Sequence, residues 1–295
     1  MNAFLIAWRT SAYLPVSVIR SVAWVGAVSA WGLRGKAVTR LEGNLSRVTG
    51  LTGKPLRKLS KRGMKSAASY YAEILELPRM SLKSIDARVR IENGAELLQI
   101  LETEDRVIIP VSHSGNWDLL GAFAGRNIGH VTSVAEVLKP VEVFEEFVSF
   151  REQLGMTIFG HEGSSTFRKL LGAINDEGGV VALVADRDLS GHGIEVQMWG
   201  QGVRVAPGPA ALAVASSTAL VPVMVYSERL TGQRRKAAKS RTGKVMKCGP
   251  AIRVPEGPKS ERVQSMTESW VAYLSDEIAA HPEDWHMLQR FGWTE

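Results

Sequence analysis

From about residue 86 onward, short apolar runs rich in β-branched residues alternate with longer amphipathic stretches. The runs at 107–112 and 180–185 are almost continuously apolar, which is typical of strands buried on both faces of a sheet. Along the chain such runs alternate with segments of helical periodicity, and this alternation predicts an α/β fold. We therefore expect a central mixed sheet with helices on both faces, and a basic strand over residues 244–254 at its edge.

The first 85 residues have a different character, and we expect them to form a helical, membrane-associating segment. Residues 86–295 would form the α/β core as one continuous domain. Residues 14–31 are apolar over about one bilayer thickness, but Arg20 interrupts them, and Trp24 and Trp31 favour the bilayer interface. This pattern predicts a helix that lies in or on the membrane surface. The small residues at 28–30 leave a cleaved signal peptide as the alternative.

The net charge of +6 is concentrated in two segments. Between residues 34 and 65 there are ten Lys and Arg residues and one acid, Glu42. Such a stretch suits anionic lipid headgroups or the phosphates of a coenzyme, although a solvated helix face explains it equally well. We expect no nucleic-acid partner, because no DNA- or RNA-binding signature accompanies the charge. The second basic segment, 229–247, is interpreted as a hairpin-like surface loop.

His113 directly follows the first apolar run and opens the sequence HSGNWD. It stands at the carboxyl end of a predicted strand, where open α/β sheets carry their sites. A tight turn through Gly115 would bring the Asp118 carboxylate back to accept Nδ1–H of His113, leaving Nε2 free as a base. Backbone N–H groups at Gly115 and Asn116 would stabilise an oxyanion at the start of the next helix. A histidine that merely caps this helix is the alternative.

The other strong apolar run ends in the charged sequence Asp186-Arg187-Asp188. Either these residues form a salt-bridge network between strand ends, or an aspartate faces the same cleft as His113 while Arg187 anchors an anion. Further on, Arg204 precedes a rigid turn and a small-residue helix, an arrangement that suits an anion site or a plain helix cap.

Several other kinds of site are not indicated. The sequence contains no G-x-S-x-G nucleophile elbow, no H-E-x-x-H zinc motif and no Walker phosphate loop. Cys248 is the only cysteine, so no disulfide can form within the chain and a reducing compartment is expected. His281 and His286, which flank Glu283 and Asp284 near the C-terminus, are expected at the surface.

Five segments in order along the chain resemble the lipid A biosynthesis-type acyltransferase family, namely HSGNWD, VAEVLKP, FREQLG, VADRDLSGHGIEV and RVAPGPAALA. They are most similar to the actinobacterial branch that acylates phosphatidylinositol mannosides. The resemblance implies an enzyme at the cytoplasmic face of the plasma membrane, peripheral or interfacially anchored, whose partners are acyl-CoA, a mannosylated phosphatidylinositol and an anionic membrane surface. It implies no metal or other cofactor. In that branch a palmitoyl-like chain is moved from acyl-CoA to the 6-hydroxyl of the mannose on inositol position 2.

Carried over residue by residue, the resemblance implies that His113 is the base, Asp118 its paired carboxylate and Asp186 the acid of the strand-end motif. Some relatives have glutamate at this last position, so the shorter Asp186 would lie further from His113. Glu136 and Arg151 fall at the acceptor-side positions. Two alternatives stay open: a glycerolipid acyltransferase with the same chemistry, and a catalytically silent lipid-binding protein with the same fold.

Overall fold

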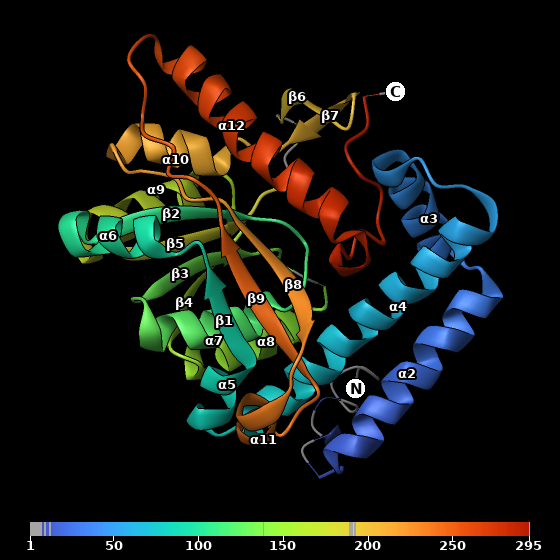
Figure 1. The fold of residues 1–295 in the computed structure, drawn as a ribbon. Coiled ribbons are helices and arrows are strands. Elements are labelled where there is room, and N and C mark those ends of the chain that lie inside the picture. The colour runs from blue at the N-terminus through green and yellow to red at the C-terminus, as the bar shows by residue number, and fades with distance from the viewer. Residues whose placement is uncertain are drawn as a thin grey trace.

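The protein is described by a computed structural model that covers residues 8, 10–11, 13–137, 139–188, 191 and 193–294. Seven strands form the central sheet in the order β1-β9-β8-β2-β5-β3-β4. Neighbouring strands are parallel except β8 and β9, so the sheet is mixed, as expected (Figure 1). The strands span Val89–Glu92 (β1), Arg106–Val111 (β2), Val131–Ala135 (β3), Met156–Gly160 (β4), Gly179–Val184 (β5), Val223–Arg229 (β8) and Thr242–Cys248 (β9).

Helices cover both faces of this sheet, which confirms the predicted class. The helices are α2 (Val16–Leu33), α3 (Lys36–Thr49), α4 (Gly53–Glu76), α5 (Leu82–Arg88), α6 (Ala95–Glu104), α7 (Trp117–Asn127), α8 (Val141–Gln153), α9 (Ser164–Gly172), α10 (Gly208–Ser216), α11 (Gly232–Ala238) and α12 (Lys259–Ala280). Alternate residues of β2 enter two separate cores. Ile108 packs with α10 and α12, whereas Val107 and Ile109 pack with α6 and α7.

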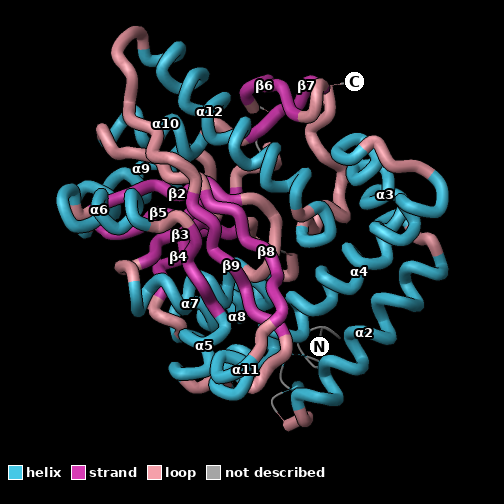
Figure 2. The backbone as a smooth tube through the Cα atoms, in the orientation of Figure 1, coloured by secondary structure: helices cyan, strands magenta, loops and turns pink. Residues whose placement is uncertain are grey.

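The strand predicted at the sheet edge lies inside the sheet instead. β9 pairs with β8 on one side and with β1 on the other. The sequence of β1, VRIE, is short and half charged, so its strand signal is weak. A separate antiparallel hairpin, β6 (Ile194–Met198) with β7 (Gln201–Val205), lies beside α12 (Figure 2). The basic segment interpreted as a loop contains α11, whose residue Ala238 is fully buried.

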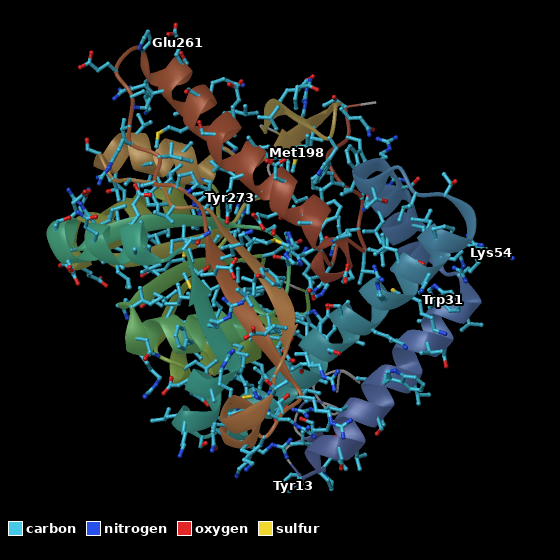
Figure 3. The ribbon with its side chains drawn as sticks, viewed as in Figure 1. Tyr13, Trp31, Lys54, Met198, Glu261 and Tyr273 are labelled. Carbon is cyan, nitrogen blue, oxygen red and sulfur yellow. The ribbon has the colours of Figure 1, made fainter. Side chains whose placement is uncertain are left out.

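Helix α2 is the one described helix that is long and apolar enough to cross a membrane. One face packs along α4: Ile19 and Ala27 are buried, and the Trp31 indole N–H donates to Ser60 at 3.0 Å. The opposite side leaves Val18, Val22 and several other large apolar side chains exposed. Figure 3 shows Tyr13 and Trp31 near the two ends of this helix. An apolar surface of this kind is typical of membrane association.

Candidate active site

His113 and Asp186 meet at the carboxyl end of the sheet. β2 and β5 are adjacent and parallel, and their last pair is Val111 opposite Val184. His113 and Asp186 each stand two positions beyond this pair. The Nδ1 atom of His113 lies 2.5 Å from Oδ1 of Asp186. The His113 side chain is 37% exposed, whereas that of Asp186 is 1% exposed. Strand register therefore places a solvent-accessible imidazole on a buried carboxylate.

The Asp186 carboxylate accepts two further hydrogen bonds, both at Oδ2. The backbone N–H of His113 donates at 3.0 Å and the indole N–H of Trp285 at 2.9 Å. Burial acts to raise the pKa of Asp186, but the His113 charge and these hydrogen bonds outweigh it, so the pKa lies below its usual value. An ionised Asp186 fixes a proton on Nδ1 of His113 and leaves Nε2 with its lone pair.

Asp118 does not bond to His113 as expected, but to two other residues. Its Oδ1 accepts from Nε of Arg151 at 2.7 Å, and its Oδ2 accepts from the Tyr70 hydroxyl at 2.9 Å. Asn116 caps α7 by accepting the Leu119 N–H at 2.9 Å, which places Asp118 in the first turn, facing α4 and α8. Among the described residues no hydrogen bond joins Asp118 to His113. The interaction that the short spacing suggested is thus made by the more distant Asp186.

Arg151 is buried with Asp118 and supports the helix that follows His113. Its guanidinium carbon lies 4.2 Å from the centroid of the Trp117 ring, and the side chain is 8% exposed. A cation over the indole face adds to the ion pair. Tyr70 completes this cluster, and burial followed by the Asp118 charge raises the pKa of its hydroxyl well above the usual value. Arg151 therefore positions the loop in this structure, rather than lining an open acceptor site.

Gly115 cannot supply the oxyanion N–H that was expected of it. Its N–H donates to the backbone oxygen of Asp284 at 3.0 Å. The residue has a φ of +58°, and an added Cβ would lie 2.6 Å from the Val225 carbonyl oxygen. Glycine is required here by conformation and by space. Within the described part of the chain the Asn116 N–H has no acceptor, so it stays the candidate oxyanion donor.

The C-terminal segment, expected at the surface, packs against the site. The His286 N–H donates to the His113 carbonyl at 2.7 Å, and Ser114 forms a bridge with Trp285. Asp284 is buried and accepts from the Ser66 hydroxyl of α4 at 2.6 Å. Burial lowers the pKa of His286 to about 4, although the Asp284 carboxylate opposes the shift. No local motif marks these residues, because their partners are up to 220 positions away.

A row of buried polar groups continues from this segment under the loop. Glu73 of α4 accepts from Asn116 Nδ2 at 2.8 Å and lies 3.4 Å from Lys244 Nζ. Lys244 in turn donates to the Ser227 hydroxyl at 3.0 Å, and Ser227 donates to Asp284 at 2.9 Å. Glu73 and Lys244 form an ion pair, and Asp284 accepts hydrogen bonds from Ser66 and Ser227. Each charged group in the row therefore has a partner, which a buried polar network needs if it is to hold one geometry.

A cavity of about 250 Å³ lies at the ends of β3 and β5, where it is lined by Ala185 and Arg187, the two neighbours of Asp186 in the sequence. Its walls include the apolar side chains of Phe167, Leu170 and Leu183. Two predicted substrate residues, Glu136 and Arg187, also line it and lie 3.5 Å apart. The site thus combines an apolar cavity with an ion pair at the strand ends.

Arg204, the remaining predicted residue, does not reach this site. Its neighbours Val203 and Val205 are buried, so the alternation of β7 turns Arg204 outward. There its side chain is 56% exposed and lies 4.0 Å from Glu195 on β6. The described residues contain no group of three His, Cys, Asp or Glu side chains that could hold a metal ion.

The sequence matches known acyltransferases over nearly all its length. It is 29% identical over 289 residues to the phosphatidylinositol mannoside acyltransferase of Mycolicibacterium smegmatis, covering 97% of this chain and 89% of that protein. It is 30% identical over 292 residues to the protein of the same name from Mycobacterium tuberculosis, covering 97% and 86%. A crystal structure of the 1-acyl-sn-glycerophosphate (LPA) acyltransferase of Thermotoga maritima is a distant match, with 12% identity, a TM-score of 0.39 and coverage of 90% and 97%. The profile of the bacterial lipid A biosynthesis acyltransferase family matches residues 2–291, and the chain therefore belongs to this family and is an acyltransferase.

Proposed function

We propose that this acyltransferase moves a long-chain, palmitoyl-like group from acyl-CoA to the 6-hydroxyl of the mannose on inositol position 2 of a phosphatidylinositol mannoside. The acceptor is proposed because both relatives are named phosphatidylinositol mannoside acyltransferases. The base is proposed from one observation: Nδ1 of His113 lies on the buried Asp186 carboxylate while the His113 side chain is partly exposed to solvent. A neutral imidazole fixed in this tautomer is suited to take a proton at Nε2.

The reaction would proceed by direct transfer. Nε2 of His113 takes the hydroxyl proton of the sugar while the oxygen attacks the thioester carbonyl. The imidazolium that forms is stabilised by the ionised Asp186, and the oxyanion by the N–H of Asn116. The tetrahedral intermediate then expels the CoA thiolate, which receives the proton from Nε2. The thioester is already activated, so the proposed step uses neither a metal nor another cofactor.

The apolar cavity at the ends of β3 and β5 is the proposed place for the part of the acyl chain next to the thioester. Phe167, Leu170 and Leu183 would contact the methylene groups, and about 0.8 kcal/mol is gained for each CH₂ removed from water. Glu136 and Arg187 lie in the same cavity, where they would hydrogen-bond the sugar hydroxyls of the acceptor.

The enzyme is proposed to work as a peripheral protein at the cytoplasmic membrane face, with α2 flat on the surface. The packed side of α2 is held by cations of α4: the Arg57 guanidinium lies 4.0 Å from the Trp31 ring and Lys65 Nζ 5.0 Å from the Trp24 ring. A helix that crossed the bilayer in this arrangement would carry the charges of α4 into the hydrocarbon, at a cost of several kcal/mol for each charge. An interfacial position keeps the cations at the headgroups.

The test is acyl transfer by purified full-length protein from radiolabelled palmitoyl-CoA to a panel of acceptors in mixed micelles. We expect CoA release with mannosylated phosphatidylinositol and a His113→Ala rate lower by at least 10²–10⁴-fold, with palmitoyl-CoA binding retained. His130→Ala, an exposed histidine on another loop, is the matched control. Near wild-type transfer by His113→Ala would disprove the base. Transfer to lysophosphatidate instead would make the enzyme a glycerolipid acyltransferase, and lipid binding without any transfer would make it a silent member of the fold.

A further inference from the structure

A second and larger cavity, of about 880 Å³, lies between α2, α4, α11 and the start of β9. Five cationic side chains line it, and one acid does. The cations are Arg20, Arg235, Lys236, Lys239 and Arg241. Because β8 runs parallel to β2 and α11 follows β8, this cavity opens on the same edge of the sheet as His113.

The positive charge of the cavity is not cancelled within the described structure. Its one acid, Glu73, is already paired with the buried Lys244. Arg20 does contact Glu76 at 2.6 Å, but Glu76 also pairs with the buried Arg88 at 2.5 Å. Two cations thus share one carboxylate, which leaves an excess of positive charge on the α2 side.

The four cations from the α11 region have no acidic partner among the described residues, and α11 itself is fixed. The carbonyl of Ala238 accepts from Ser84 at 2.9 Å and from Arg88 Nε at 3.1 Å. Arg234 pairs with Glu228 at 2.7 Å. The helix therefore presents Arg235 and Lys236 from a stable position, and like charges held side by side favour an anion between them.

The wall opposite α11 belongs to the helix that we place on the membrane. Arg20, Ala23 and Trp24 of α2 line the cavity, while Val22 and Val25 beside them are exposed. A bilayer that covered these valines would bring its phosphate layer to the level of the cavity, since Trp favours that level. Figure 1 shows α2 running beside α4, with α11 at the lower end of the sheet.

From this arrangement we propose that the cavity is a binding site for the phosphodiester of an anionic lipid headgroup. Arginine forks at Arg235 and Arg241 would hold the phosphate oxygens in pairs, and the lysines would add charge. The inference rests on the proposed function, because the acceptor named there is itself a phosphodiester lipid. Ser69 and Glu73 of α4 line the cavity, and Glu73 also accepts from Asn116 in the loop of His113 at 2.8 Å, so a lipid held here lies beside that loop.

The first test measures binding of the full-length protein to sedimented vesicles, without turnover. Vesicles of phosphatidylcholine are compared with vesicles that contain one-fifth phosphatidylinositol or phosphatidylglycerol. The test variant removes three charges of the cavity, Arg235→Gln, Lys236→Gln and Lys239→Gln. The matched control removes three exposed charges from other elements, Arg168→Gln, Lys259→Gln and Arg290→Gln. At low salt we expect each cation removed from the cavity to lower the affinity about fivefold, so the test variant should lose about a hundredfold in affinity for both kinds of anionic vesicle. The control variant should lose less than threefold.

A second variant tests whether the arginines bind the phosphate through hydrogen bonds of defined geometry or only attract anionic lipid through their positive charge. Arg235→Lys with Arg241→Lys keeps the charge but removes the forks, and we expect a several-fold loss for phosphatidylinositol vesicles. An unchanged affinity, or equal losses in the test and control triples, would overturn the inference. So would CoA or inorganic phosphate that bound to the same residues with no dependence on lipid. His113→Ala should bind vesicles as the wild type does, so a failure of the acyl transfer reaction and a failure of this site give different results.

Discussion

Replacing Asp186 by asparagine tests which carboxylate controls His113. In the wild type, Oδ2 of Asp186 receives two N–H groups, from the His113 backbone and Trp285, and Oδ1 meets Nδ1 of His113. Asparagine has only one oxygen. If this oxygen takes the Oδ2 place, both N–H groups keep their acceptor and the amide NH₂ faces Nδ1. If it takes the Oδ1 place, the NH₂ faces two donors and two hydrogen bonds are lost.

The free-energy difference between these orientations decides the tautomer of the histidine. Two buried donors without an acceptor cost about 1–3 kcal/mol each, so the orientation with oxygen at the Oδ2 place is favoured by about 2–6 kcal/mol. The NH₂ group then forces Nδ1 to act as an acceptor and moves the ring proton to Nε2. A protonated Nε2 cannot take the hydroxyl proton. We therefore expect kcat to fall on the order of 10²–10⁴-fold, or about 3–5 kcal/mol in the barrier.

The assay compares kcat for acyl transfer with the tautomer seen by ¹⁵N NMR of His113. Asp118→Asn is the control, because its amide can still accept from Arg151 and donate to Tyr70, whose hydroxyl can reverse its role. We expect this control to keep the His113 tautomer and to lose mainly stability. If Asp186→Asn retained kcat within tenfold while Asp118→Asn abolished transfer in folded protein, the assignment of Asp186 as the orienting carboxylate would be refuted.

Two further results are expected from the residues behind His113. The neutral ring of His286, with its pKa lowered to about 4, takes up a proton in the unfolded chain near pH 6.5. The contribution of His286 to the free energy of unfolding is therefore complete above pH 6.5 and falls by about 3 kcal/mol as the pH drops from 6.5 to about 4. Urea unfolding of His286→Gln should lack this loss. An equal loss in the variant would contradict the role given to His286. Gly115→Ala should lower both kcat and Tm, because its Cβ would meet the Val225 carbonyl at φ +58°. The control Gly125→Ala, in helix α7 with no atom closer than 3.8 Å to the new Cβ, should keep kcat and should not lower Tm, because Ala is favoured over Gly in a helix.

The parts of the fold that the sequence predicted are those with a strong local signal. β2 and β5 are buried on both faces, so their residues are almost all apolar. Six residues of each strand are enough to show the apolar run that predicts a buried strand. β1 is short and carries Arg90 and Glu92, whose charges pair with each other at 2.8 Å. Its place beside β9 depends on pairing across 155 residues, and for that reason β9 was predicted at the edge.

The site shows the same division between local and distant information. From the strand ends, a cleft shared by His113 and an aspartate was one of two alternatives, because parallel strands bring their carboxyl ends together. The short side chain of Asp186 was expected to lie further from His113, but it contacts Nδ1 directly at 2.5 Å. The rotation of Asp118 away from His113 depends on Arg151 and Tyr70, which are 33 and 48 residues away. The indole N–H of Trp285 donates to Asp186 across 99 residues, so the residues around His113 and Asp186 could not predict this contact.

Helix α4 links the apolar helix α2 to the site through the geometry of its turns. Ser66, Tyr70 and Glu73 are spaced by four and three residues, so they lie on one face and contact Asp284, Asp118 and Asn116. The neighbouring face carries Glu76, which pairs with Arg20 of α2. A single rigid helix therefore sets the distance from the apolar side of α2 to the loop of His113. In the proposed reaction at the bilayer surface, this distance would determine which hydroxyl of a headgroup reaches Nε2 of His113. The selectivity for the acceptor would then depend on α4 as much as on the cavity at the ends of β3 and β5.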